Sequence, residues 1–219
     1  MQSLFFFANE TIHYPILIGF VVSSLALALS PGPDNIFVLT QSVANGVKSG
    51  LATVLGLVSG CLVHTTLLAF GVSEIIKRSD SIFFAIKLFG AAYLLYLAYK
   101  VLRSDASILL NKEKSPAKSP MKLFWTGFTM NVLNPKVTIF FLAFFPGFLF
   151  SDTLNTVLQF YILGLLFMLS AFLVFGTIAV LAGNISKYLT GHSKAGHYLK
   201  WLQIIVFVGI AIYLIVSDK

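Results

Sequence analysis

The chain has 219 residues, of which 58% are hydrophobic and only 11% are charged, and its mean hydropathy is +0.90. A soluble domain averages roughly 25% charged residues, and a chain of this size buries only about 70% of its surface on folding. This composition argues against a soluble enzyme, a nucleic-acid-binding protein and a disordered chain. The net charge of +7 does not alter this, because the 15 Lys and Arg residues lie mainly in short gaps between apolar stretches.

Long windows without charge predict the membrane spans. Four windows contain no Asp, Glu, Lys or Arg, and two more contain one lysine each, Lys87 or Lys136. Because a spanning helix needs about 20 mainly apolar residues, we predict an all-α membrane protein. Its six helices are expected at 14–43, 48–72, 81–102, 122–148, 153–182 and 198–216. The first is longer than a bilayer requires, which predicts a break within it.

Loop charges predict the orientation of these spans. Cytoplasmic loops carry the excess of Lys and Arg, so the side with more cations is expected inside. Ten cations fall on one side, at Lys48, Lys100, Arg103, Lys112, Lys114, Lys118, Lys122, Lys187, Lys194 and Lys200, and three on the other, at Lys77, Arg78 and Lys219. Both termini are therefore expected outside. Trp125 and Trp201, each just after a basic residue at the inner start of a span, agree with this orientation.

The chain is expected to form one transmembrane domain of two similar halves. A polar segment at 104–120, with two Ser-Pro pairs, separates a first repeat at 1–103 from a second at 121–219. Each half holds three spans, and because three is odd, the second half must lie inverted relative to the first. Inverted repeats with discontinuous helices are frequent in secondary transporters.

The first span of each half carries helix-breaking residues. In the first span these are Pro31, Gly32 and Pro33, and in the fourth span the breaker is Pro135. Proline lacks the amide hydrogen that a helix needs, and the carbonyl groups it frees must face protein or water within a membrane. Each break is therefore expected to line a cavity, with a polar shell contributed by Ser30, Asn35, Asn131 and Asn134.

Asp34 and Lys136 are the ionisable residues at these breaks. A charge near the membrane centre costs about 3 kcal/mol or more and usually faces a partner or a water-filled path. The two side chains are expected either to pair or to grip opposite ends of one zwitterion. Lys87, six residues into the third span, is instead expected to extend toward the interface.

The second span has small residues at helical spacing. Gly56 and Gly60 continue a pattern that begins at Gly46 and Gly50, and such residues allow helices to approach closely. His64 lies on the same face. Because histidine titrates near neutral pH, His64 and Asp34 are candidate proton carriers, although a structural, hydrogen-bonded histidine is the alternative. No cluster has the spacing of metal ligands, and no cofactor is expected.

The motifs together resemble the LysE/RhtB family of amino-acid exporters. They are Ser30-Pro-Gly-Pro-Asp34, the glycines from Gly46 to Gly60, Leu88-Phe-Gly-Ala-Ala-Tyr-Leu-Leu-Tyr96 and Asn134-Pro-Lys136, in order along nearly the whole chain. The resemblance implies a six-helix bacterial inner-membrane protein that exports amino acids or their derivatives in exchange for protons. Homoserine- and threonine-type members resemble the chain more than exporters of basic amino acids do.

Other classes of function fit the sequence less well. An ion or metal-ion permease on the same scaffold is the alternative, but a cation path would need more oxygen ligands than Asp34 supplies. An intramembrane enzyme lacks a paired acid and base, and a primary pump lacks a nucleotide-binding loop. The substrate, the coupling ion and assembly with further copies of the chain are left open.

Overall fold

The computed structural model describes residues 12–30, 32–72, 80–104, 119–182, 184–185 and 195–216. Within them all regular structure is helical, which confirms the predicted fold class. The helices are α2 (Tyr14–Leu29), α3 (Pro33–Asn45), α4 (Val47–Leu67) with the π-helical turn η2 (Leu68–Val72), α6 (Asp80–Arg103), α7 (Pro120–Val132), α8 (Pro135–Phe144) with the 3-10 turn η3 (Phe145–Phe148), α9 (Thr156–Val180) and α11 (Ala195–Val216). Pro31 and most of the 104–120 segment lie outside the described residues.

Four helices are individually long and apolar enough to cross a membrane, at Val47–Gly71, Phe84–Arg103, Thr156–Val180 and His197–Val216. Two further spans are bent pairs: α2 and α3 meet at 59°, and α7 meets the segment Pro135–Phe148 at 53°. With each pair counted as one span, the six spans fall where the sequence predicts them. Large apolar side chains such as Phe84 and Ile205 are exposed, as expected for helices that face lipid.

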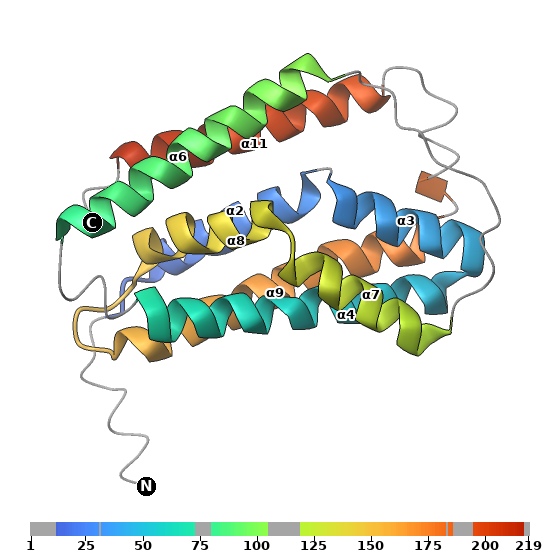
Figure 1. Cartoon of the computed structure of the whole chain (residues 1–219), viewed down its shortest axis with the longest axis horizontal. Coiled ribbons are helices and arrows are strands. Elements are labelled where there is room, and N and C mark those ends of the chain that lie inside the picture. Colours follow the sequence, from blue (N-terminus) through green and yellow to red (C-terminus); the bar gives the residue numbers. More distant parts are fainter. Residues whose placement is uncertain are drawn as a thin grey trace, which may run out of the picture.

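The helices run roughly along one axis of the molecule, so that connections gather at two ends. Figure 1 shows α6 and α11 side by side along one flank. The rest of the bundle consists of α4, α9 and the two bent pairs, α2 with α3 and α7 with α8. The end that carries Lys48, Lys100, Arg103, Lys122 and Lys200 is called the basic end below. The first described helix begins, and the last one ends, at the opposite end.

Helices of the first half pack against helices of the second half. α4 packs against α7, and α9, the corresponding helix of the second half, packs against α2. This reciprocal packing is what an inverted repeat would give, but the division into two inverted repeats stays a prediction.

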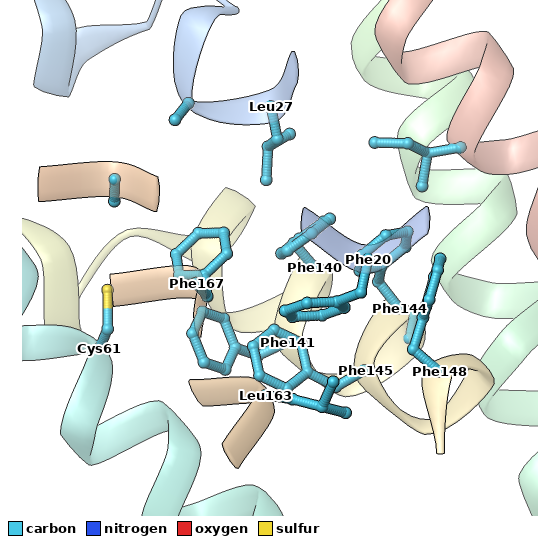
Figure 2. Packing of buried hydrophobic residues seen from close by; sticks show 14 of the residues in the cluster. Phe20, Leu27, Cys61, Phe140, Phe141, Phe144, Phe145, Phe148, Leu163 and Phe167 are labelled. Atoms are coloured by element: carbon cyan, nitrogen blue, oxygen red, sulfur yellow. The ribbon is translucent and has the colours of Figure 1, made fainter. Parts of the chain in front are cut away.

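Phenylalanines fill the core on the side of the breaks away from the basic end. Phe140, Phe141, Phe144, Phe145 and Phe148 come from α8 and η3, and all are almost completely buried. Phe20 of α2 and Phe167 of α9 pack against them, as Figure 2 shows. Because aromatic rings pack here edge to face and offset, they fill this part of the bundle without polar groups.

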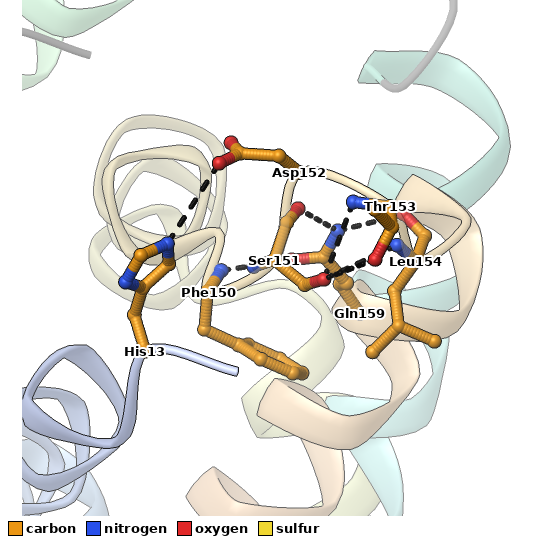
Figure 3. Close-up of polar contacts among 7 residues, drawn as sticks. All are labelled: His13, Phe150, Ser151, Asp152, Thr153, Leu154 and Gln159. Carbon is orange, nitrogen blue, oxygen red and sulfur yellow. Dashed lines mark hydrogen bonds and ion pairs between the residues drawn. The ribbon is translucent and has the colours of Figure 1, made fainter. Parts of the chain in front are cut away.

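The connection between η3 and α9 is held in place by one buried side chain (Figure 3). The Oε1 atom of Gln159 accepts from the amides of Phe150 and Ser151, and its amide nitrogen donates to the carbonyls of Ser151 and Leu154. His13 joins α2 to the same connection, because its amide donates to the carbonyl of Phe150 and its ring lies 3.7 Å from Asp152. The phenylalanine-rich end of the bundle is thus tied together.

Candidate functional site

The first break separates α2 from α3. Ser30 and Gly32 have extended backbones, and Pro33 is the first residue of α3. Proline suits that position because the first amides of a helix have no carbonyl partner. The side chain of Asn35 turns back and donates to the carbonyl of Ala28 at 2.7 Å. It thereby satisfies a carbonyl that the break leaves without a helical partner.

The second break has a different cap. α7 ends at Val132, and Asn134 caps α8 by accepting from the amide of Lys136 at 3.0 Å, with Pro135 at the first helical position. An asparagine that caps a helix in this way fixes the direction of the chain after the break.

The two breaks meet through Asn134. Its side-chain nitrogen lies 3.5 Å and 3.4 Å from the two carboxylate oxygens of Asp34, and Asp34 is only 8% exposed. The ammonium of Lys136 lies nearby, over the ring of Phe207 at 4.8 Å from its centroid. No direct ion pair joins Asp34 to Lys136 in the described part of the chain. The carboxylate of Asp34 therefore has the carboxamide of Asn134 as its hydrogen-bond partner, and whether the two charges grip opposite ends of one substrate stays a prediction.

Asn131 lies near the end of α7, just before the second break, and it contacts two residues of α4. Its carbonyl lies 3.1 Å from Nε2 of His64, and its side-chain oxygen accepts from the thiol of Cys61 at 3.7 Å. The other ring nitrogen of His64, Nδ1, is buried and has no hydrogen-bond partner among the residues that the structure describes. The contact with Asn131 is compatible with a structural role for His64, and both this role and a part in proton transfer stay predictions.

The four predicted packing glycines occupy two kinds of position. A methyl group on Gly56 would strike the carbonyl of Phe124, and one on Gly60 would come within 2.7 Å of the side chain of Asn131, so both keep α4 close to α7. Gly50 likewise leaves room for Ser42. Gly46 differs: a methyl group there would meet nothing within 4 Å, and its φ of +84° shows that the turn between α3 and α4 requires glycine.

A small cavity of about 40 Å³ lies between the breaks, enough for a few water molecules. Its polar wall is made by residues of the two breaks: Gly32, Pro33, Asp34, Asn35, Asn131, Asn134 and Lys136. Of the described residues that we predicted to bind substrate, to break the helices or to carry protons, Ser30, Pro135 and His64 lie outside this lining. The hydroxyl of Ser30 is buried and has no hydrogen-bond partner within the described ranges.

A second, wider pocket of about 310 Å³ lies on the other side of Lys136. It shares Gly32, Pro33, Asn134 and Lys136 with the small cavity, and it extends to Lys100 and Ser104 at the basic end. The pocket therefore reaches the breaks from the basic end, while the phenylalanine core occupies the opposite side.

Several residues near the site were not predicted from the sequence. Phe167, Ala171 and Phe175 of α9 line the small cavity, and Phe207 of α11 contacts Lys136. Their spacing marks an ordinary buried face, so no local signal distinguishes them. Lys87 is only 5% exposed, which contradicts the expected extension of its side chain toward the interface.

The side chains that the structure describes do not form a metal site. Nowhere in the described ranges do three His, Cys, Asp or Glu side chains gather closely enough to hold a metal ion. The polar side chains of the breaks that line the small cavity are one carboxylate, one ammonium and three carboxamides, which suit an organic ion better than a metal.

An apolar bundle with two broken helices meeting at a buried, charged cavity defines a multi-span membrane protein of the kind that carries small molecules. The chain belongs to the family of LysE type translocators, which it matches over residues 25–218. It is 27% identical over 192 residues to a leucine efflux protein of Klebsiella pneumoniae, covering 88% of this chain and 91% of that protein. A leucine efflux protein of Salmonella choleraesuis is likewise 27% identical over 195 residues, with 88% and 91% covered. No solved structure matches the chain.

Proposed function

We propose that the protein exports an amino acid across the bacterial inner membrane in exchange for protons. The observation that carries this proposal is the pair of broken helices, which bring Asp34, Asn134 and Lys136 to one cavity. Membership of a translocator family and the similarity to leucine efflux proteins support amino-acid export. The protein acts as a carrier in this proposal, not as an enzyme.

The chemistry of the cavity suits the two charged groups of an amino acid. The carboxylate of Asp34 attracts the substrate ammonium. The ammonium of Lys136, next to the positive N-terminus of α8, attracts the substrate carboxylate. Because Asp34 and Lys136 make no direct ion pair within the described residues, both charges are available to a substrate that inserts between them.

Exchange with protons follows from the same carboxylate. A proton that reaches Asp34 from outside neutralises it, which weakens its hold on the substrate ammonium and favours release outside. The empty carrier then returns with the proton. The basic end is the cytoplasmic end in this proposal, so the wider pocket is the entrance for substrate and both termini lie outside.

Export from proteoliposomes tests the proposal. Purified full-length protein is reconstituted with labelled leucine, alanine and threonine inside, and release is followed with and without an imposed proton gradient. Release is expected to slow when an uncoupler collapses the gradient at constant substrate load. The methyl ester of leucine, which lacks the carboxylate, is expected to compete poorly.

Two results would contradict the proposal in different ways. Release that continues unchanged after uncoupling would show a facilitator rather than an exchanger. Metal-ion uptake together with no amino-acid release would favour the permease.

A further inference from the structure

Apart from the residues of the breaks, the described lining of the small cavity is apolar except for the thiol of Cys61, and we call this part the apolar wall. It is built by α2, α4, α8 and α9, through Leu27, Ala28, Leu57, Val58, Cys61, Val137, Phe140, Phe167, Ala171 and Phe175. The described lining contains two charged residues, Asp34 and Lys136, and both come from the breaks. The charged groups of the described lining therefore come from the breaks, and the surrounding helices supply mainly apolar side chains.

α9 contributes a regular stripe to the apolar wall. Phe167, Ala171 and Phe175 are spaced four residues apart, so they follow one face of the helix toward Asp34 and the breaks. Ala171 lies between Phe167 and Phe175 along the helix, lines the same cavity and has the smallest side chain of the three. Cys61 and Val58 face this stripe from α4.

We propose that this apolar wall receives the side chain of the transported amino acid, and that Ala171 sets the size of side chain the carrier accepts. This inference rests on the function proposed above and names its substrate class: amino acids with uncharged, apolar side chains. Asp34 and Lys136 hold the charged groups that all amino acids share, whereas the α9 stripe distinguishes one side chain from another.

The physical reason is the scarcity of polar partners along the apolar wall. A charged or hydroxyl-bearing side chain placed there would lose its hydrogen bonds to water, and this wall offers in return only the thiol of Cys61, which already donates to Asn131. The space of about 40 Å³ must also widen before a side chain enters, so α4 and α9 have to move apart as substrate binds. A larger residue at position 171 would then reduce the space that such a movement opens.

The first experiment uses the unaltered protein. Proteoliposomes loaded with labelled leucine are exposed to a tenfold excess of unlabelled alanine, valine, leucine, lysine or glutamate, and exchange is measured. Valine and leucine are expected to exchange well, and lysine and glutamate poorly. Equal exchange with all five amino acids, or a preference for lysine or glutamate, would overturn the inference.

The second experiment changes the size of the wall. Ala171→Leu is expected to lower exchange of leucine relative to alanine by about tenfold, because small differences in an apolar pocket change discrimination by about 10- to 200-fold. Phe175→Ala is expected to raise exchange of phenylalanine relative to alanine. Monodisperse elution in detergent verifies that each variant folds.

Matched controls lie on the same helix. Gly176→Leu adds the same side chain where a methyl group would meet nothing within 4 Å, and Phe172→Ala removes the same ring from an exposed position. Both controls are expected to keep the unaltered ratios. Exchange by the pocket variants that changes equally for all substrates would refute the role of α9 while leaving amino-acid export intact. No amino-acid exchange by the unaltered protein would instead refute the proposed function, and this inference with it.

Discussion

Asn134 is the residue at which the two broken helices are joined. Its side-chain oxygen caps α8 and its side-chain nitrogen faces Asp34, so one carboxamide serves both a helix end and the site. Hydrogen bonds to a charged group contribute about 1.5–3 kcal/mol. Position 134 is therefore expected to affect transport more than the loss of a helix cap alone would.

Asn134→Ala tests this dual role against Asn155→Ala. Asn155 caps α9 in the same way, by accepting from the amide of Val157 at 2.8 Å, but it lies in the connection after η3. Each variant is expected to lose about 1 kcal/mol of stability with its cap. In addition, Asn134→Ala is expected to lower the rate of export about tenfold relative to the unaltered protein, whereas Asn155→Ala is expected to leave that rate nearly unchanged. Thermal unfolding in detergent and export from proteoliposomes give the two readings, and equal export by both variants would contradict the role of Asn134.

The charges of Asp34 and Lys136 give a second prediction at this scale. Asp34→Asn and Lys136→Gln are each expected to abolish export while the protein still inserts into the membrane. Because no direct ion pair joins Asp34 to Lys136 in the described part of the chain, export by the double variant is not expected to exceed export by either single variant. The control is Asp152→Asn, which removes an exposed carboxylate far from the breaks. Normal export by either single variant would contradict the role of that charge in the site.

At the scale of elements, the contact between α4 and α7 is a backbone contact. Gly56 lies against the carbonyl of Phe124, and Gly127 of α7 lies against the carbonyl of Thr53, with only 2.5 Å left for a methyl group. Backbone atoms cannot rotate away as side chains do. The close approach also places Asn131 beside Cys61 and His64. The position of the second break therefore depends on glycine in α4.

Gly56→Val is expected to destabilise the protein by about 1–3 kcal/mol or more, since overpacking a tight contact forces the backbone to move. The matched control is Gly209→Val in α11, where a methyl group would meet nothing within 4 Å. The midpoint of thermal unfolding in detergent is expected to fall for Gly56→Val and to change little for Gly209→Val. Similar midpoints for the two variants would show that α4 and α7 can move apart without loss of stability.

At the scale of the whole molecule, the two ends differ in charge and in packing. The wider pocket extends from the breaks to the basic end, and the phenylalanine core lies between the breaks and the other end. If the basic end is cytoplasmic, this conformation offers the site to the cytoplasm and seals it from outside. Transport then requires α8 and η3 to move relative to α2 and α9, because these elements supply the rings.

Cysteine labelling tests this orientation. In a Cys61→Ser background, Ser104→Cys marks the basic end and Asp152→Cys marks the opposite end, and both positions are exposed. A thiol reagent that cannot cross the membrane is expected to label position 152, and not position 104, on intact cells. Labelling of both positions after the cells are opened is the control. The reverse pattern on intact cells would place the basic end outside.

Much of the site could be predicted from the sequence because breaks and charges are local features. Proline, glycine and asparagine within an apolar window identify both breaks, and Asp34 and Lys136 stand out wherever the helices pack. The sequence could not show that Asn134 rather than Lys136 reaches Asp34, because that contact joins residues 100 positions apart. It also could not show that Lys87 is buried, since burial depends on which helices surround that face.

The sequence by itself determined that most of the chain lies in a lipid bilayer, where its spans are and where its helices break. Hydrophobicity over about 20 residues decides whether a segment enters a bilayer, and proline interrupts a helix whatever its neighbours are. The tertiary structure alone decided which side chains share the cavity. Phe167, Ala171 and Phe175 look like any buried face of a helix until α9 is placed beside α2 and α4. The reason is that apolar side chains carry no directional signal, so only the packing of whole helices selects the ones that face the breaks.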